Sequence, residues 1–337
     1  MKTNYLKAAL AAVLVFSLAL AGCVNQEKQG DLSDEEVAKM VEEFPKKDIR
    51  LICPPKQGGL SDFITRLLAG YAEEAAGANV IVENRPGAAG ATGMRHGSGA
   101  NPDGYTVTYV TVESTILKHR KDIDETVSYT DFELLARLNY GPASISVNAN
   151  SQWQTFGDFV EHAKANPGDV NIGNSGQYSI WHLASAVMAD SLGIDVGYVP
   201  YDGAAPSVKD LLGGHLDAVV ASPSEVTDYV KSGQLRMLAV FSEEREVEMP
   251  DVPTAKELNY DIVVGAWGGL GVPLNTPEEI QQKLIEMFKA GFDDPEFQEK
   301  CKARSAGANW QDKEAFTEFA AKQDEMFGRV LSDLKME

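Results

Sequence analysis

The chain has 337 residues with 30 Lys and Arg against 50 Asp and Glu, which gives a formal net charge of −20. This length suits about two domains, and so acidic a surface argues against nucleic acid or an anionic lipid surface as the main ligand. Three cysteines are too few for a disulfide scaffold or a cysteine-rich metal site, and no apolar run reaches the roughly 20 residues of a spanning helix.

The first 22 residues predict a lipoprotein export signal. Lys2 and Lys7 supply its positive start, and the apolar residues 8–21 are too few to span a bilayer. The segment ends in Leu20-Ala21-Gly22-Cys23, and small residues before a cysteine are typical of cleavage in front of that cysteine and attachment of lipid to its thiol. A soluble secretory signal with an unrelated cysteine is the alternative. Removal of residues 1–22 takes away two lysines and no acids, which changes the net charge to −22.

Cys23 is therefore the predicted lipidation site, and acyl chains on it would hold the protein to a membrane. The predicted location is extracytoplasmic, in a periplasm or on the outer face of the cell membrane. Residues 23–45 are polar and acidic and predict a tether with a short helix. Cys53 lies in a strand-like run and is expected to be buried. A disulfide between Cys53 and Cys301 stays open, because the sequence cannot place their Cα atoms within reach.

Strand-like and helix-like segments alternate from residue 47 onward. The predicted strands are residues 49–53, 80–82, 105–112, 170–173, 197–200, 216–221 and 235–241. The predicted helices are residues 60–71, 179–192, 204–212 and 224–231, then 277–291, 293–303 and 311–334 in a mostly helical C-terminal stretch. This order predicts an α/β fold of mainly parallel sheets flanked by helices. In such sheets, ligands bind beyond the carboxyl ends of the strands.

Residues 54–62 form the first candidate binding loop, between a strand and a helix. Gly58 and Gly59 allow a ligand to approach the backbone, and Ser61 or Asp62 is expected to cap the helix. The free N–H groups at that helix start would make an anion site. An ordinary turn that ends in a capped helix is the alternative.

Residues 83–93 form the second candidate loop. Their glycines follow a G-x-x-G-x-x-G spacing, which is not the dinucleotide fingerprint. Residues this small indicate close packing of the backbone or contact of the backbone with a ligand. Arg85 is either a carboxylate clamp or one half of a structural ion pair.

Residues 173–182 form the third candidate loop and again join a strand to a helix. Ser175 and Ser179 offer hydroxyl groups there. Gln177 stands where a nucleophile elbow would need glycine. His182 is more typical of a packed residue than of a catalytic base.

Motifs of enzymes and metal sites are otherwise absent from the sequence. It contains no G-x-x-x-x-G-K-[ST], no H-E-x-x-H and no paired C-x-x-C, and its five histidines show no metal-ligand spacing. We therefore expect no catalytic residue, no metal and no cofactor.

Short motifs follow one another in a fixed order between residues 47 and 300. They include Gly58-Gly59-x-Ser61-Asp62, Val82-Glu83-Asn84-Arg85-Pro86-Gly87-Ala88-Ala89-Gly90, Pro102-Asp103-Gly104-Tyr105-Thr106, Gly173-Asn174-Ser175-Gly176, Val199-Pro200-Tyr201-Asp202-Gly203-Ala204-Ala205-Pro206 and Asp251-Val252-Pro253-Thr254-Ala255. As a set, these motifs make the chain resemble the extracytoplasmic solute receptors of tripartite tricarboxylate transporters, also called Bug or TctC-type binding proteins.

The resemblance implies a two-domain periplasmic-binding-protein fold of the Venus flytrap kind. It implies that residues 46–142 and 256–337 form one domain and residues 143–255 the other. The ligand would be a small carboxylate: an organic acid, a di- or tricarboxylate, an acidic amino acid or an aromatic acid. The receptor would be a monomer that delivers this ligand to a membrane permease with one large and one small subunit.

The candidate loops and the resemblance together predict a site that holds a carboxylate through main-chain N–H groups, hydroxyls and water. In the first domain the predicted site residues are Gln57, Gly58, Gly59, Ser61, Asp62, Gly87, Ala88, Gly90 and Thr111. In the second domain they are Ser175, Gly176, Tyr178, Ser179, Tyr201, Asp202 and Ser222.

Several residues depart from the family pattern. Gln57 stands where members commonly have proline, and Tyr178 stands where they usually have glycine. Bulkier residues also replace small or hydroxyl residues at Val112, Ile180 and Trp181. If these side chains face the cleft, they favour a monocarboxylate or an aromatic acid over a citrate-like ligand. Two other functions stay open: a ligand-sensing receptor that feeds a membrane sensor, and a secreted serine hydrolase that uses Ser175 or Ser179.

Overall fold

The computed structural model describes residues 34–120, 123 and 126–333. The expected export signal, the lipidation site at Cys23 and the start of the tether lie outside these residues. Among the described residues, those from Glu43 onward belong to one compact unit, and those before Glu43 belong to another. Helix α2 (Asp34–Glu43) is the short helix expected in the tether. Among the described residues, no helix is both long and apolar enough to span a bilayer.

The first sheet of the compact unit has six strands in the order β11-β4-β10-β3-β1-β2. Strand β1 (Ile49–Cys53) lies next to the edge strand β2 (Val80–Asn84) and pairs in parallel with β2 and with β3 (Thr106–Thr111). The other strands run antiparallel to their neighbours: β4 (Phe132–Pro142), β10 (Gly265–Pro273) and β11 (Ala308–Gln311). Since β1, β2 and β3 are parallel, the segments that follow them leave from the same edge of the sheet.

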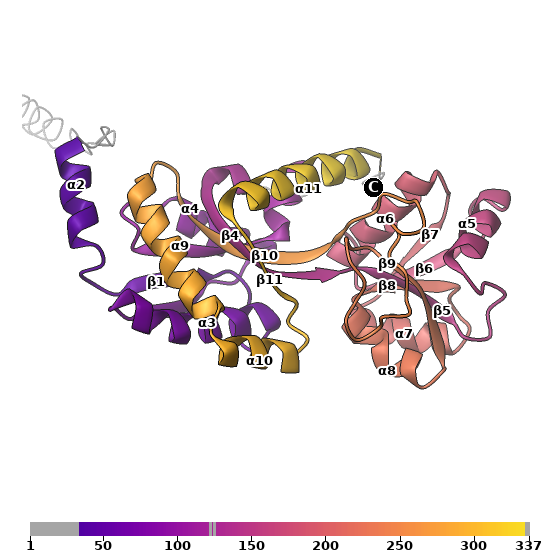
Figure 1. Ribbon diagram of the computed structural model, residues 1–337. Helices are drawn as coiled ribbons and strands as arrows, with labels where there is room; N and C mark the ends of the chain where they lie inside the picture. Colours follow the sequence, from indigo (N-terminus) through magenta and orange to yellow (C-terminus); the bar gives the residue numbers. More distant parts are fainter. Residues whose placement is uncertain (1–33, 121–122, 124–125, 334–337) are drawn as a thin grey trace, which may run out of the picture. The chain divides into compact units, whose positions relative to one another are not determined.

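Helices of two kinds accompany the first sheet, and Figure 1 labels the longer ones. The longer ones are α3 (Leu60–Ala76), α4 (Ala91–Ser98), α9 (Glu278–Phe292), α10 (Pro295–Ala303) and α11 (Lys313–Asp333). Four single turns of 3-10 helix complete the set: η1 (Ala88–Gly90), η2 (Val112–Thr115), η3 (Leu117–His119) and η4 (Tyr129–Asp131).

The second sheet has five strands in the order β7-β6-β8-β5-β9. These are β5 (Ser144–Asn148), β6 (Asn171–Asn174), β7 (Gly197–Pro200), β8 (Ala218–Ala221) and β9 (Leu235–Val240). Strand β6 is parallel to β7 and β8, whereas β5 is antiparallel to β8 and β9. The helices between these strands are α5 (Phe156–Ala165), α6 (Ile180–Leu192), α7 (Ala204–Leu212) and α8 (Pro223–Lys231).

The α/β class is confirmed, but both sheets are mixed rather than mainly parallel. The antiparallel strands β4, β5, β10 and β11 were not among the predicted elements. Strand β10 reads GAWGGLGVP, and glycine is depleted in strands. The glycines are needed for packing: a Cβ on Gly268 would lie 2.0 Å from the hydroxyl of Tyr109, and one on Gly269 would lie 2.5 Å from the carbonyl oxygen of Ala136.

Three chain segments meet where the two sheets join. The Ala143 N–H donates to Val264 O (2.9 Å), the Phe241 N–H donates to Ala143 O (2.8 Å), and the Val264 N–H donates to Phe241 O (3.1 Å). Helix α11 makes a further link, because Arg329 pairs with Asp190 of α6 at 2.9 Å. The expected domain division follows the distribution of strands. It stays a prediction, since all these residues belong to one compact unit.

Cys53 and Cys301 are both buried free thiols. The disulfide between them that the sequence left open is therefore not formed. Burial raises the pKa of both thiols, to about 11 for Cys301. Both are inert packing residues at neutral pH.

Helices α3 and α9 approach each other so closely that one position between them requires glycine. A Cβ on Gly291 of α9 would lie 2.8 Å from the backbone nitrogen of Ala72, whereas one on Gly70 of α3 would meet no atom within 4 Å. We expect Gly291→Ala to lower the free energy of unfolding by about 1–3 kcal/mol. Gly70→Ala should raise it by about 0.5–1 kcal/mol.

Urea denaturation of the two variants beside the parent chain measures both changes. Because both substitutions place alanine in a helix, they differ only in the space available. Shifts of the same sign would contradict the close approach of the two helix backbones.

Candidate functional site

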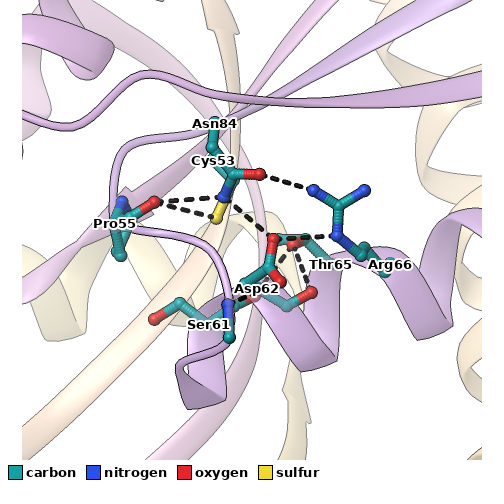
Figure 2. A network of polar contacts seen from close by, with 8 residues as sticks. Cys53, Pro55, Ser61, Asp62, Thr65, Arg66 and Asn84 are labelled. Carbon is teal, nitrogen blue, oxygen red and sulfur yellow. Dashed lines mark hydrogen bonds and ion pairs between the residues drawn. The ribbon is translucent and has the colours of Figure 1, made fainter.

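The turn between β1 and α3 is organised by one buried carboxylate (Figure 2). Asp62 is only 4% exposed, and its side chain lies between those of Asn84 and Arg66 in Figure 2. Its Oδ2 accepts the N–H of Gly58 at 3.0 Å. Its Oδ1 accepts Nδ2 of Asn84 at 2.8 Å and Nε of Arg66 at 2.9 Å. Asn84 also donates to the carbonyl oxygen of Pro55 at 3.1 Å, which ties the end of β2 to the turn.

This environment keeps Asp62 ionised. Burial alone would raise the pKa of Asp62, but hydrogen bonds from Gly58, Asn84 and Arg66 outweigh it and hold the pKa below its ordinary value. The structure thus places the Asp62 carboxylate on the turn itself, where it fixes the backbone. The expected cap was wrong: α3 begins at Leu60 with Gly59 as its N-cap, and no side chain bonds to that cap.

The main-chain N–H groups of Gly59, Leu60 and Ser61 remain available at this helix start. Helix geometry gives them no acceptor in the preceding turn, and within the described chain they make no hydrogen bond. Gly58 and Gly59 are exposed, as is Gln57 beside them. The turn therefore presents three amide donors together with the positive end of the α3 dipole, which is an arrangement that attracts an anion.

The second loop, residues 83–93, packs directly against the first. A Cβ on Gly93 would lie 2.8 Å from Cα of Pro54, so the two backbones touch. The backbone takes positive φ angles at four successive residues, Gly87, Ala88, Ala89 and Gly90. Such a run is strained at the two alanines and is typical of functional loops. Arg85 pairs with Glu83 at 2.6 Å, which fits the ion-pair alternative rather than the carboxylate clamp.

Thr111 at the end of β3 completes this group of loops. A Cβ on Gly90 would lie 3.9 Å from the Thr111 hydroxyl and 3.5 Å from Cβ of Pro54. The structure therefore brings the predicted site residues of the first sheet together at one edge, where β1, β2 and β3 end.

Three residues beside this edge were missed by the sequence analysis. The Tyr109 hydroxyl donates to Oδ1 of Asn139 at 2.6 Å. Burial raises the pKa of the half-buried Glu113, although a hydrogen bond from Thr111 opposes the rise. Asn139 lies in the segment FELLARLNY of β4, which also contains Glu133 and Arg137. Because this strand was not predicted, no local signal marked Asn139.

The third loop holds its own amides more tightly than expected. The Gly176 N–H donates to Oδ1 of Asn174 at 3.1 Å, and the Tyr178 N–H donates to Nδ1 of His182 at 2.9 Å. Ser179 caps α6 by accepting the N–H of His182 at 3.2 Å, and the Ser175 hydroxyl donates to the Ser179 oxygen at 3.1 Å. Within the described chain, the N–H groups of Gln177, Ile180 and Trp181 make no hydrogen bond.

The bulky side chains of this loop face the core. Trp181 is 9% exposed and belongs to the main hydrophobic cluster, and Ile180 and Tyr178 pack against that cluster. Val112 at the end of β3 is buried in the same cluster. Trp181 and Val112 therefore lie in the core, whereas Tyr178 and Ile180 stay partly exposed. The preference for a monocarboxylate or an aromatic acid stays a prediction.

The other predicted residues of the second sheet have partners nearby. Tyr201 lies beside the third loop, since a Cβ on Gly176 would be 3.4 Å from its carbonyl oxygen, and its hydroxyl donates to Asp210 at 2.7 Å. Asp202 is exposed. Ser222 forms a capping box with Glu225 at the start of α8. Among the described residues, no cluster of three or more His, Cys, Asp or Glu side chains could hold a metal ion.

His182 should make the folded protein sensitive to acid. Burial lowers the pKa of His182 from 6.5 to about 4. Between those values an unfolded chain binds a proton that the folded protein excludes. The free energy of unfolding should therefore fall as the pH is lowered through this window, by at most about 3 kcal/mol.

Denaturation of the variant His182→Gln at pH 7 and pH 4.5 should show a smaller acid loss than that of the parent chain. The exposed His96 provides the matched control, and His96→Gln should keep the full loss. An unchanged loss in His182→Gln would contradict the neutral, buried state of this ring.

Asp62→Asn should loosen the first turn. The amide cannot supply a charged acceptor to both Gly58 and Arg66, so we expect the free energy of unfolding to fall by about 1–3 kcal/mol. Asp202→Asn, an exposed change beside the other turn, should leave stability unchanged. Equal stabilities of the two variants in urea would show that the Asp62 network does not hold the turn.

Comparison with known proteins agrees with this architecture. The family model for the tripartite tricarboxylate transporter family receptor, TctC, matches residues 64–336. The UPF0065 protein in the gbd 5' region of Cupriavidus necator is 33% identical over 306 residues, which are 90% of this chain and 92% of that protein. A TctC solute binding protein from Polaromonas has 34% identity and a TM-score of 0.82, over 86% of this chain and 100% of the other.

Further solved structures share the fold. The periplasmic binding protein BugD has 28% identity and a TM-score of 0.63, over 86% of this chain and 98% of the other. Two Rhodopseudomonas palustris proteins, MatC with bound malate and a second with adipate, have 22% and 23% identity, each with a TM-score of 0.64. They cover 86% of this chain and 100% and 97% of their own lengths. The periplasmic-binding-protein fold is thereby confirmed, and the chain belongs to the TctC family of tripartite tricarboxylate transporter receptors.

Proposed function

We propose that this protein is an extracytoplasmic substrate-binding lipoprotein that captures a small carboxylate and delivers it to a tripartite tricarboxylate-type permease. Lipid on Cys23 would tether it, and the permease would have one large and one small membrane subunit. The receptor family supports the transport role. The sequence at residues 20–23 supports the anchor.

The observation that carries this proposal is the set of three available amides at the start of α3. One carboxylate of the ligand would accept hydrogen bonds from the N–H groups of Gly59, Leu60 and Ser61. Charge-assisted hydrogen bonds contribute about 1.5–3 kcal/mol each, and the helix terminus adds up to about 2 kcal/mol when partly buried. Such a set reaches the roughly 8 kcal/mol of micromolar binding without an arginine clamp.

The loop that opens α6 would supply the second side of the site. Ser175, Ser179 and the N–H of Gln177 are the groups that could reach a ligand there. Contacts from both sides would exist only when the two sheets approach, so the ligand would favour the closed arrangement. The segments that cross at Ala143 would then act as the hinge, and the expected domains would be residues 46–142 with 256–337, and 143–255.

An aliphatic acid fits the site best. Glycine and alanine are frequent in the second loop, and Trp181 of the third loop lies in the core. Proteins of the same fold hold malate and adipate. The overall negative charge opposes an anion weakly, because salt screens it over about 8–10 Å.

The geometry disfavours a serine hydrolase. Ser179 accepts the main-chain N–H of His182, and Nδ1 of that ring accepts the Tyr178 N–H. These bonds occupy the groups that a serine–histidine pair would use. A ligand-sensing receptor would share the binding site proposed here and differ only in its membrane partner.

Leu60→Pro tests the amide site directly. Leu60 is the first helical residue of α3 and is 45% exposed, and the residue before it, Gly59, has a ψ of 177° that suits a following proline. The substitution therefore removes one N–H donor while the helix start is kept. We expect the dissociation constant of the best ligand among malate, adipate, succinate, glutamate and citrate to rise about 10-fold or more in calorimetry.

Leu60→Ala is the matched control, because it removes the side chain and keeps the N–H. It should bind like the parent chain, and the melting temperatures of all three proteins should agree. Equal affinities of the proline and alanine variants would remove this amide from the site. Failure of the parent chain to bind any of these acids would argue against the proposed function.

A further inference from the structure

A contact between Arg120 and Tyr178 joins the segment after β3 to the turn that opens α6. The guanidinium carbon of Arg120 lies 5.0 Å from the centroid of the Tyr178 ring, and both side chains are half-buried. The other cation–π contacts among the described residues all lie within segments of the first sheet. The pair Arg120 and Tyr178, here called the clasp, is thus the contact of this type that links the segments of the two sheets.

The clasp acts on a strained residue. Tyr178 has a φ of +59°, which lies in the left-handed region of the backbone angles. Residues other than glycine rarely adopt this region. Such a conformation persists only where neighbouring groups hold it. Here the Tyr178 N–H donates to Nδ1 of His182 at 2.9 Å, the two rings lie 5.9 Å apart, and Arg120 lies over the Tyr178 ring.

The Arg120 end of the clasp is itself anchored on helix α11. Asp324 of α11 bonds to both residues that precede Arg120, at 2.7 Å to Lys118 and 2.9 Å to His119. A Cβ on Gly328 would lie 2.8 Å from the His119 ring, so this ring packs directly on the helix. Farther along α11, Arg329 pairs with Asp190 of α6. The clasp therefore completes a closed path of contacts from β3 through α11 and α6 to the turn.

We propose that Arg120 is a positioning residue that holds the turn at residues 175–179 in its binding conformation through the ring of Tyr178. Without the cation over the ring, the strained backbone of Tyr178 opens more often, and Ser175 and Ser179 lose their fixed places. The effect on the turn stands on its own contacts. The effect on ligand affinity rests on the function proposed above.

Hydrogen exchange of the full chain without ligand tests the clasp. Arg120→Gln should speed exchange of a peptide that covers residues 175–182 by about 2- to 5-fold, the range expected for a half-exposed cation–π contact. Tyr178→Leu should do the same, whereas Arg120→Lys and Tyr178→Phe, which keep a cation and a ring, should exchange more like the parent chain. Lys47→Gln is the matched control, because Lys47 lies 4.1 Å from the ring of Tyr105 at the other end of β3.

Calorimetry with malate and adipate adds the functional readout. Arg120→Gln should raise the dissociation constant of whichever probe binds by a similar factor, with Lys47→Gln unchanged. Unchanged exchange at residues 175–182 in Arg120→Gln would overturn the proposal. So would faster exchange spread evenly over the chain, because that indicates a loss of global stability. If neither probe binds the parent chain, the proposed function is in question, while the exchange result still decides the clasp.

Discussion

One buried carboxylate, that of Asp62, determines the geometry of the first turn. It accepts hydrogen bonds from a main-chain N–H, from the Asn84 amide and from the Arg66 guanidinium. These three donors come from the turn, from the end of β2 and from α3, so a single side chain fixes the relative places of three elements. The donors also make ionisation favourable inside the protein. Asp62 therefore fixes the turn that leads into α3.

The two candidate turns use their amides in similar ways. At the start of α3, Asp62 accepts the Gly58 N–H, and the next three N–H groups make no hydrogen bond within the described chain. At the start of α6, the side chains of Asn174 and His182 accept two N–H groups, and three others make no hydrogen bond within the described chain. The second turn differs by adding the hydroxyl groups of Ser175 and Ser179. Under the proposed function, the free amides at both helix starts would let so acidic a protein hold an anion.

The sequence predicted the parts of the fold whose signals are local. Helix α6 was predicted to within one residue, and α3 was predicted from its first residue but ended five residues too early. Strands β4 and β10 were missed, because their pairing depends on distant residues and because four glycines in β10 mask its strand character. The candidate loops could be located because glycine after a parallel strand is a local pattern, and their role in binding stays a prediction. The orientation of Ile180 and Trp181 was not predictable, because it depends on which core α6 covers.

The bonds of Asp62 were also only partly predictable from the sequence. Its place soon after two glycines indicated a binding loop. Arg66 lies one helical turn further along α3, within the reach of a sequence pattern. Asn84 is 22 residues away, and sequence spacing could not show that it bonds to the Asp62 carboxylate. The Tyr109–Asn139 pair was missed for the same reason, since Asn139 lies on one of the unpredicted strands.

The order of the strands has a consequence for biosynthesis. The second sheet is built from one continuous stretch, residues 144–240, whereas the first sheet takes β10 and β11 from the far side of that stretch. As the chain emerges during synthesis, all strands of the second sheet are present before those of the first sheet are complete. Strand β4 pairs only with β10 and β11, so both of its edges stay unpaired until those later strands are made. An unpaired edge can bind a strand of another chain. Completion of the first sheet is therefore the stage at which a newly made molecule is most exposed to aggregation.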